Sequence, residues 1–454
     1  MNLSGSKQKG RHAHVLWHGS THDVVKDLSM KTIAVVGGGI TGVTTAYALA
    51  KRGFSVTLFE RHRYAAMETS FANGGQLSAS NAEVWTHWST ILKGMKWMLK
   101  NDAPLLVNPK PSWHKLSWFA EFIGAMPHYE KNTIETARLA IAARQYLFAW
   151  AEAEGIDFDL KKQGILHIYR DKKGFDHAGK VSQLLAQGGL ARCAVTPEEM
   201  KAIEPTLAGD YYGGYFTDSD STGDIHKFTH GLAKAAARLG VSTLYDQDVI
   251  SVSSNDRQAV ITVRHSDARP CVHTFDGVVV CAGVASRQFA EQLGDRVNIY
   301  PVKGYSITVN LQDPESQAGA PTVSLLDDET KLVTSRLGLD RFRVAGTAEF
   351  NGYNRDIRAD RIAPLVQWVQ RCFPKIDTRS VVPWAGLRPM MPNMMPKVGR
   401  GHLSNVFYNT GHGHLGWTLS AITADMVADI IAKPMNLQVA VGHFNVQAKP
   451  GSIF

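Results

Sequence analysis

Residues 32–42, with the sequence TIAVVGGGITG, join a β-branched apolar run directly to a cluster of glycines. A run of strand length that enters such a cluster predicts a buried strand turning sharply into a helix. Residues 43–52 continue with helix-compatible Ala, Tyr and Leu up to Gly53, and residues 55–60 (SVTLFE) have the pattern of a second buried strand. Together these residues predict a complete β-α-β unit of about thirty residues.

The glycines of this unit have the spacing of a dinucleotide-binding turn. Gly37 permits the tight turn, Gly39 lets backbone N–H groups approach a pyrophosphate, and Gly42 allows the helix to pack closely on the strand. The positive end of the helix dipole then faces the phosphates. Glu60 ends the second strand, where an acid accepts hydrogen bonds from the adenosine ribose. A purely structural glycine turn is the alternative, and the β-α-β context favours the dinucleotide.

The remainder of the chain alternates between segments typical of a nucleotide-binding domain and segments of different composition. Residues 84–128 are rich in Trp, Lys and Pro, residues 277–283 (GVVVCAG) predict another buried strand, and residues 300–350 are rich in strand-forming residues. We therefore predict an α/β fold, α+β overall, in which a substrate domain with a mixed, largely antiparallel sheet is inserted into a Rossmann-type domain. The expected ranges are 30–84, 195–299 and 386–432 for the nucleotide-binding domain, 85–194 and 300–385 for the substrate domain, 1–29 for a disordered extension and 433–454 for a C-terminal tail.

Composition limits the function classes only weakly. The net charge of +8, from 49 Lys and Arg against 41 Asp and Glu, fits an anionic substrate, an anionic membrane surface or nothing specific, and no motif supports nucleic-acid binding. The four cysteines, Cys193, Cys271, Cys281 and Cys372, lack the spacing of a metal site or a disulfide framework. No uninterrupted apolar run reaches the ~18 residues of a membrane span, and residues 1–29 lack a signal-peptide core. These features predict a cytoplasmic protein without a bound metal.

A second glycine cluster, residues 411–416 (GHGHLG), precedes an apolar helix predicted from Trp417. The N-terminus of such a helix favours negative charge on N1 and the C2 carbonyl of a reduced flavin. NAD enzymes have no such requirement at the far end of the chain. The cluster therefore favours FAD over NAD, the alternative being a plain loop before an amphipathic helix.

Several further segments form a recognisable set: 69–78 (TSFANGGQLS), 222–224 (TGD), 300–306 (YPVKGYS), 343–349 (RVAGTAE), 386–390 (GLRPM) and 409–413 (NTGHG). With these segments the chain resembles the D-amino acid oxidase superfamily, and within it the bacterial D-amino acid dehydrogenases of small-subunit type, over residues 30–432. The resemblance implies non-covalent FAD and oxidative deamination of D-amino acids to 2-oxo acids and ammonia. It also implies an electron acceptor that is a quinone or an electron-transfer protein.

The resemblance carries over to individual cofactor-binding residues. Ser70 and its neighbours are expected to cover the pyrophosphate, Asn73 to Gln76 to approach the isoalloxazine ring, and Val249 to contact adenine through its backbone. The full set of expected FAD-binding residues is Ile33, Ala34, Val35, Val36, Gly37, Gly38, Gly39, Ile40, Thr41, Gly42, Glu60, Arg61, Ser70, Asn73, Gly74, Gly75, Gln76, Val249, Ala282, Gly283, Gly411, Gly413, Leu415 and Gly416.

Three residues are candidates for the catalytic site. Arg388 matches an arginine that binds the substrate carboxylate in related oxidases, a role that suits a planar guanidinium; bracing of a loop through backbone carbonyls is the alternative. Tyr305 could line the substrate pocket with its hydroxyl or be a packed aromatic residue. His412, like His414, could be a general base. Hydride transfer from the Cα of a neutral amine needs no protein base, however, and the alternative is that both histidines are polar loop residues beside the flavin.

Residues 88–100 place apolar side chains largely on one helical face and three lysines on the other. Such a helix could lie on the inner face of the cell membrane, or could pack on the domain as a surface helix. Two further enzyme activities share the expected scaffold, those of an amino acid oxidase and of a sarcosine- or D-proline-type secondary amine dehydrogenase. A flavin-holding subunit without catalytic function is the alternative outside catalysis.

Overall fold

The computed structural model describes residues 32–87, 104–255, 257–265 and 269–433. The predicted β-α-β unit is present as β1 (Thr32–Val36), α1 (Ile40–Ala50) and β2 (Ser55–Phe59). Strand β1 lies between β2 and β13 (Gly277–Val280) and is parallel to both. The carboxyl ends of these three strands therefore meet at one edge of the sheet, where the glycines of residues 37–39 follow β1.

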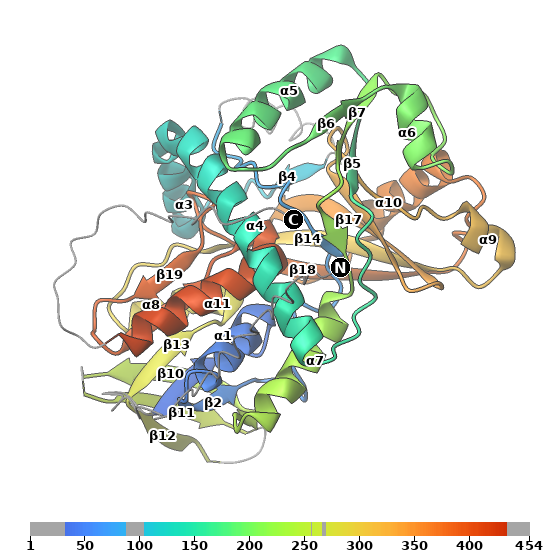
Figure 1. Ribbon diagram of the computed structural model, residues 1–454. Helices are drawn as coiled ribbons and strands as arrows, with labels where there is room; N and C mark the ends of the chain where they lie inside the picture. The colour runs from blue at the N-terminus through green and yellow to red at the C-terminus, as the bar shows by residue number, and fades with distance from the viewer. Residues whose placement is uncertain (1–31, 88–103, 256, 266–268, 434–454) are drawn as a thin grey trace, which may run out of the picture.

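Three distant parts of the chain build this sheet. Its strand order is β19-β20-β13-β1-β2-β9, with β9 (Ser242–Leu244), β19 (Lys397–Arg400) and β20 (Val406–Thr410). All neighbours are parallel except the β19–β20 pair. Figure 1 shows the blue N-terminal strands beside the yellow β13 and the red C-terminal segment. The nucleotide-binding fold is thus discontinuous in sequence.

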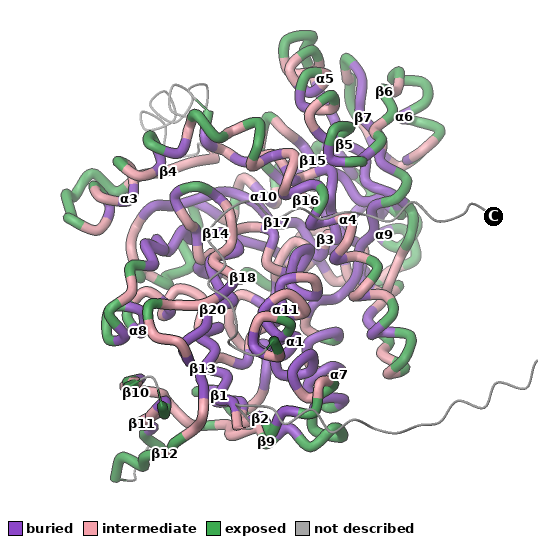
Figure 2. The backbone as a smooth tube through the Cα atoms, turned by 60° about the vertical axis from the view of Figure 1, so that its left-hand side comes forward, coloured by how far each residue is buried: buried purple, intermediate pink, exposed green. Residues whose placement is uncertain are grey.

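Both faces of this sheet are covered. Along β1, Ile33 and Val35 face helices α1, α7 (Ile225–Arg238) and α11 (Gly416–Ala432), while Ala34 and Val36 face the small sheet β10-β11-β12. Its strands are β10 (Asp248–Ser254), β11 (Ala259–Arg264) and β12 (Cys271–Phe275). Burial on both faces explains the continuous apolar run of β1. Figure 2 shows buried backbone through β1 and β13, whereas α3, α5 and α6 carry exposed residues.

A nine-stranded sheet forms the second half of the molecule, in the order β18-β14-β17-β16-β15-β5-β7-β6 with β4 paired to β17. It is antiparallel except for the β4–β17 and β5–β15 pairs. Its strands are β4 (Leu105–Val107), β5 (Ile165–Tyr169), β6 (Cys193–Val195), β7 (Gly213–Thr217), β14 (Tyr300–Asn310), β15 (Ser324–Asp327), β16 (Leu332–Leu337), β17 (Arg341–Phe350) and β18 (Val381–Met390).

Helix α10 (Ala359–Cys372) packs on one face of this sheet and α3 (Trp113–Gly124) on the other, because alternate residues of β14 join the two different cores. The remaining elements are β3 (Gln76–Leu77), η1 (Met126–His128), α4 (Tyr129–Ala153), α5 (Lys172–Gln187), α6 (Pro197–Ile203), β8 (Ser221–Thr222), η2 (Gly283–Ala285), α8 (Ser286–Gln292), α9 (Pro314–Gly319) and η3 (Gly413–Leu415).

Sheet membership differs from the predicted domain ranges at two points. Strand β7 pairs with β5 and β6 in the nine-stranded sheet, although residues 195–299 were assigned to the nucleotide-binding domain. Strand β18 crosses the predicted boundary at residue 386 and pairs with β14 along its whole length. The pattern of a strand reveals that it is a strand but not which sheet it joins. The predicted disordered extension 1–29, the predicted helix of residues 88–100 and the predicted tail after Lys433 lie outside the described residues.

Within the described residues one helical stretch, Gly413–Ala432, is long and apolar enough to cross a membrane by length and composition. This stretch contains α11, which packs against α1 and α4. Ala421, Ala424, Val427 and Ala428 are fully buried in the core of the nucleotide-binding half. We therefore interpret α11 as a core helix.

Candidate active site

The first turn of α1 forms an open helix N-terminus. Gly37 adopts φ +107°, and a Cβ there would lie 2.7 Å from the carbonyl oxygen of Cys281, so the turn requires glycine. Gly39 has no side chain to cap the helix, and the first turn holds no acidic residue. The Ile40 N–H donates to Ser70 Oγ over 3.0 Å, which places Ser70 where it was predicted, beside the phosphate-binding turn. Because neither Gly39 nor an acidic residue of the first turn neutralises this helix N-terminus, it can attract an anion beside Ser70.

Glu60 lies directly after β2 and is 7% exposed. Its carboxylate accepts hydrogen bonds from Gly38 N–H at 2.7 Å and from His62 N–H at 2.9 Å. Burial raises the pKa of Glu60, and these two N–H donors partly offset that effect. The acid thus stands beside the glycine turn, as the predicted ribose contact requires.

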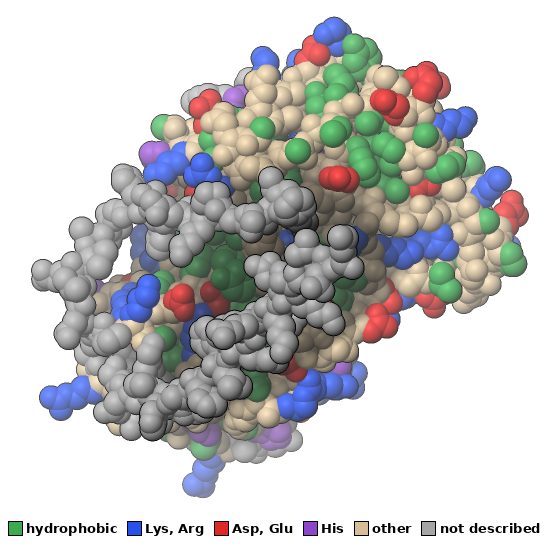
Figure 3. Space-filling model, in the orientation of Figure 1, with side chains coloured by type: hydrophobic (Ala, Val, Ile, Leu, Met, Phe, Trp, Pro, Cys, Tyr) green, Lys and Arg blue, Asp and Glu red, His purple; other side chains and the backbone are tan. Residues whose placement is uncertain are grey.

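A cavity of about 860 Å³ runs from this turn to the N-terminus of α11, near the upper end of the ~300–1,000 Å³ usual for small-molecule sites. On the face shown in Figure 3 the surface is hollowed near its centre, with hydrophobic side chains visible inside. Twenty of the predicted FAD-binding residues line the cavity: Val36, Gly37, Gly38, Gly39, Ile40, Thr41, Glu60, Arg61, Ser70, Asn73, Gly74, Gly75, Gln76, Val249, Ala282, Gly283, Gly411, Gly413, Leu415 and Gly416.

The other four predicted residues support the turn from behind and do not line the cavity. Ile33, Ala34 and Val35 are fully buried inside β1. A Cβ on Gly42 would lie 1.7 Å from the carbonyl oxygen of Gly37, so this glycine packs the helix against the turn. Ile33, Ala34 and Val35 face the two cores of a doubly covered sheet, whereas Val36, at the end of β1, reaches the cavity.

Polar atoms without partners mark the far end of the cavity. Gln76 Oε1 and Trp417 Nε1 are buried and form no hydrogen bond within the described part of the chain, and both residues line the cavity. Such orphaned groups cost roughly 1–3 kcal/mol each unless a ligand pairs with them. An open helix terminus at one end and unpaired polar groups at the other fit a long ligand with phosphates and a polar ring, such as FAD.

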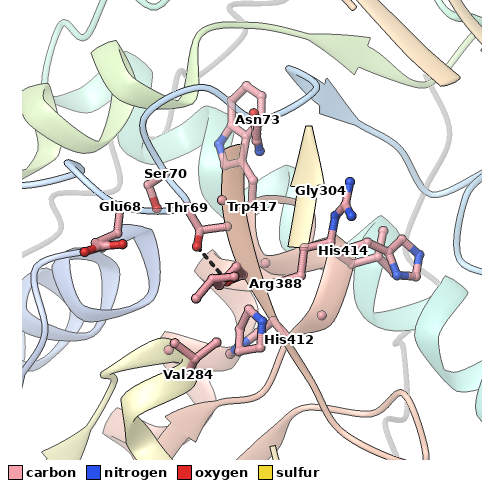
Figure 4. A pocket seen from close by; sticks show the side chains of 18 of the residues that line it. Glu68, Thr69, Ser70, Asn73, Val284, Gly304, Arg388, His412, His414 and Trp417 are labelled. Carbon is pink, nitrogen blue, oxygen red and sulfur yellow. Dashed lines mark hydrogen bonds between the residues drawn. The ribbon is translucent and has the colours of Figure 1, made fainter. Parts of the chain in front are cut away.

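Arg388 extends into this cavity from β18. Its guanidinium lies across Gly304 of β14, where a Cβ would come within 2.2 Å of Nη1 (Figure 4). Nη1 donates to the Thr347 carbonyl at 2.8 Å and Nη2 to the Gly346 carbonyl at 3.4 Å. Among the described residues the partners of Arg388 are these carbonyls and no acid, and desolvation lowers its pKa to about 10. The guanidinium is held by neutral carbonyls, so its charge is free for an anionic ligand.

A β-bulge supplies these carbonyls. The pairing of β14 with β17 shifts register between Lys303 and Tyr305, opposite Gly346 to Glu349. Thr347 sits in the bulge with φ +54°, an uncommon conformation for a β-branched residue. Bulges re-aim backbone groups next to active sites, and here two carbonyls leave the strand ladder to hold Arg388. Arg388 therefore braces this part of β17 through backbone carbonyls, which was the alternative role. Its positive charge has no acidic partner in the described chain and can also bind a carboxylate.

Tyr305 is placed as a packed aromatic residue. Although it contributes to the cavity wall, its hydroxyl donates to Glu349 at 2.7 Å, and the side chain is 1% exposed. Burial and the Glu349 carboxylate raise its pKa. Tyr305 belongs to the face of β14 opposite Gly304, where Lys303 also pairs with Glu349. The prediction of a hydroxyl in the substrate pocket is not supported, because strand alternation turns residue 305 away from the Arg388 guanidinium.

The two histidines of the glycine cluster differ. His412 Nε2 bonds to Thr423 Oγ1 of α11 at 3.0 Å, and the ring is 3% exposed with its pKa lowered to about 3 by desolvation. His414 instead stacks on Trp85, with ring centroids 4.9 Å apart and Nε2 3.2 Å from the Asn81 carbonyl. In Figure 4 the two rings point in different directions, and the ring of His414 is the one beside Arg388. Only Nε2 of His412 is bonded to α11; its Nδ1 is buried without a partner in the described part of the chain and the residue lines the cavity, so the catalytic assignment of His412 stays a prediction.

Several residues of this site were not predicted as such. Gly304 and Thr347 hold Arg388, and Thr69 Oγ1 donates to the Leu387 carbonyl at 2.9 Å, tying the flavin-binding loop to β18. Trp417 and Glu68 also line the cavity. All but Trp417 and Glu68 belong to the segments that carry the family resemblance, but no spacing in the sequence reveals which strand residues face each other. Only the register of β14, β17 and β18 does so.

Comparison with known proteins agrees with this geometry. A model of the family described as "FAD dependent oxidoreductase" (DAO) matches residues 32–430. The chain is 61% identical over 403 residues to D-amino acid dehydrogenase 3 of Mesorhizobium japonicum, covering 89% of this chain and 97% of that one. It is 40% identical to D-amino acid dehydrogenase of Paramagnetospirillum magneticum, covering 88% and 94%.

Solved structures show the same fold at low identity. Glycine oxidase from Geobacillus kaustophilus matches with a TM-score of 0.67 at 20% identity, over 88% of this chain and 94% of that one. L-proline dehydrogenase from P. horikoshii matches with a TM-score of 0.68 at 18% identity, over 88% and 93%. The predicted superfamily is confirmed: the chain belongs to the FAD-dependent oxidoreductases of the DAO family, and its cofactor is FAD.

Proposed function

We propose that this protein oxidises the Cα–N bond of D-amino acids, releasing a 2-oxo acid and ammonia, and that it passes the electrons to an acceptor other than oxygen. The relatives at 61% and 40% identity bear the name D-amino acid dehydrogenase. The single observation in the structure that carries the proposal is Arg388. It places a cation without an acidic partner inside the FAD cavity, held over Gly304 by two carbonyls.

The residues of the chain account for binding and orientation. Arg388 binds the substrate carboxylate with N–H donors that the carbonyls of Gly346 and Thr347 leave free, and it thereby fixes the position of Cα. When bound, FAD supplies the hydride acceptor. The apolar wall of Trp118, Phe119, Phe122 and Phe350 shields the reacting atoms from water. The product imine is hydrolysed by water after it leaves this wall.

Anaerobic mixing with a panel of D- and L-amino acids, including proline, tests this function. Loss of the oxidised flavin absorbance with D-isomers is the expected result. A flavin that no amine reduces, in protein that binds FAD, would remove the proposed activity and favour a flavin-holding subunit. Preferential reduction by a secondary amine would instead assign the sarcosine- or D-proline-type activity.

The electron acceptor follows from the same assay in air. We expect little hydrogen peroxide during turnover and rapid reoxidation by a soluble quinone. Stoichiometric peroxide would identify an oxidase. An oxidase and a dehydrogenase both accept hydride from the substrate on the flavin. They differ only in the acceptor that reoxidises the flavin, and this measurement identifies that acceptor.

Contact with the inner face of the cell membrane is part of the proposal, since quinones lie in the bilayer. Helix α3 exposes Trp113, Leu116 and Ile123, which are 83%, 54% and 47% accessible, and Ile123 also lines the FAD cavity. Apolar residues at this spacing form one stripe of a helix. We expect the protein to sediment with anionic phospholipid vesicles and W113A/L116A to sediment less. Absence of vesicle binding by the wild type would leave the protein entirely cytoplasmic.

A further inference from the structure

The imidazole of His414 is fixed in one tautomer. Its Nε2 lies 3.2 Å from the Asn81 carbonyl oxygen, an atom that can only accept a hydrogen bond. Nε2 must therefore carry the proton. A neutral ring has a single N–H, so Nδ1 presents a bare lone pair.

The ring is also neutral and rigid. Desolvation, helped by the nearby charges of Arg388 and Lys331, lowers the pKa of His414 to about 4, although the Asn81 carbonyl acts in the opposite direction. Stacking on Trp85 at an interplanar angle of 16° holds the plane of the ring. His414 therefore offers an acceptor and does not supply a second positive charge beside Arg388.

Nδ1 has no hydrogen-bond partner within the described part of the chain, and it is buried. The residue lines the FAD cavity together with Arg388. Figure 4 shows the Arg388 guanidinium at Gly304 with His414 to one side of it, and the Arg388 charge acts on the His414 ring. A donor for the carboxylate and an acceptor without a partner thus stand side by side in one cavity.

We propose that His414 Nδ1 accepts a hydrogen bond from the α-amino group of the substrate, so that Arg388 and His414 together recognise the two polar groups of an amino acid. This inference rests on the proposed function and deepens it. Because Arg388 and Lys331 repel an ammonium ion, His414 receives the neutral amine. The neutral amine is also the form from which hydride leaves Cα. The contact needs no proton transfer to the ring.

Two substitutions separate the two nitrogens of the ring. In His414→Gln the side-chain amide reaches the place of Nε2 and keeps the contact with Asn81, but the acceptor at Nδ1 is lost. In His414→Asn the amide oxygen takes the place of Nδ1 and the contact with Asn81 is lost. The flavin absorbance of each variant reports whether FAD is bound normally.

The test compares an amino acid with the acid that lacks only its amino group, for example D-alanine with propionate. For His414→Gln we expect kcat/KM for the D-amino acid to fall about 10- to 100-fold, the loss of one hydrogen bond to a strongly polar partner. The Kd of the simple carboxylate, measured by the change of flavin absorbance, should stay within about twofold. His414→Asn should recover most of the lost kcat/KM.

Three outcomes overturn the inference: equal weakening of both ligands, unchanged kcat/KM in His414→Gln, or a change confined to FAD affinity and spectrum. The first makes His414 a structural residue and the third makes Nδ1 a contact to the cofactor. Failure of the proposed function is distinct from these outcomes. It requires that no amino acid reduce the wild-type flavin, whatever happens in the His414 variants.

Discussion

At position 304 the absence of a side chain decides where Arg388 can lie. A methyl group there would fall 2.2 Å from Nη1 and 2.3 Å from Cζ, well inside van der Waals contact. We expect Gly304→Ala to displace the guanidinium, raise KM for D-amino acids at least tenfold and leave FAD bound. Steady-state kinetics and flavin absorbance measure the two effects. Gly124→Ala is the matched control, since a Cβ at that position meets no atom within 4 Å.

We expect that no other cationic residue can replace Arg388. Lysine retains the charge but cannot bind two carbonyls and a carboxylate together. We predict that Arg388→Lys raises KM by about 10- to 100-fold and that Arg388→Ala raises it further, each with FAD retained. Unchanged KM in Arg388→Ala would take this residue out of the carboxylate site and leave bracing of the Thr347 bulge as its role.

For single residues, the sequence predicted which of them lie at the cofactor site better than it predicted the direction of their side chains. Gly37, Glu60 and Ser70 lie together at the first turn of α1, as their spacing indicated, because the geometry of a β-α turn is local; their contacts with FAD stay predictions. The hydrogen bonds of Tyr305 and His412 were not predictable, because they depend on Glu349 and Thr423, which lie elsewhere in the chain. Single-residue roles that depend on distant partners cannot be derived from local pattern.

Among the elements, the loop after β2 is fastened to the loop after β17. Glu68 of the first pairs with Arg355 of the second and also with Arg61 and His62. Although burial opposes it, this pairing holds the pKa of Glu68 at about 2. Both Glu68 and Arg355 line the cavity. The two halves of the molecule are therefore tied together at the rim of the FAD site.

This ion pair predicts a pH dependence of stability. A carboxyl whose pKa is lowered on folding stabilises the protein above its ordinary pKa of about 4.5, and the stabilisation is lost as the pH falls toward about 2. We expect wild type to melt at a higher temperature than Glu68→Gln at pH 7. The difference should shrink as the pH falls below about 4.5. Thermal melts of both proteins across this range measure it, and a constant difference would assign the effect of the substitution to packing.

The positions of helices and strands could be predicted from the sequence better than their pairing. The first β-α-β unit, β13 and α11 occur where their patterns indicated, because each is long or strongly apolar. The bulge in β17 was not predictable. Its left-handed residue is a threonine, which local preference would not place there. The sheet to which β6 and β7 belong also depends on pairing between distant segments.

For the whole molecule, FAD is expected to act as a structural ligand. Its cavity is bounded by residues from the N-terminal, central and C-terminal parts of the chain, so binding favours only the complete fold. Saturation at about a hundred times Kd contributes roughly 2.7 kcal/mol. We therefore expect the melting temperature of apoprotein to rise with added FAD. Protein that stays colourless after this addition, and melts unchanged, would contradict the assignment of the cofactor.

The discontinuous sheet has a consequence for biosynthesis. β1, α1 and β2 are synthesised well before their sheet neighbour β20 and the covering helix α11. A nascent chain would expose one apolar side of α1 until α11 has been synthesised. Because the start of α11 lines the cavity, we expect FAD to bind only after α11 has been synthesised, and chaperones to bind the exposed apolar surface before then.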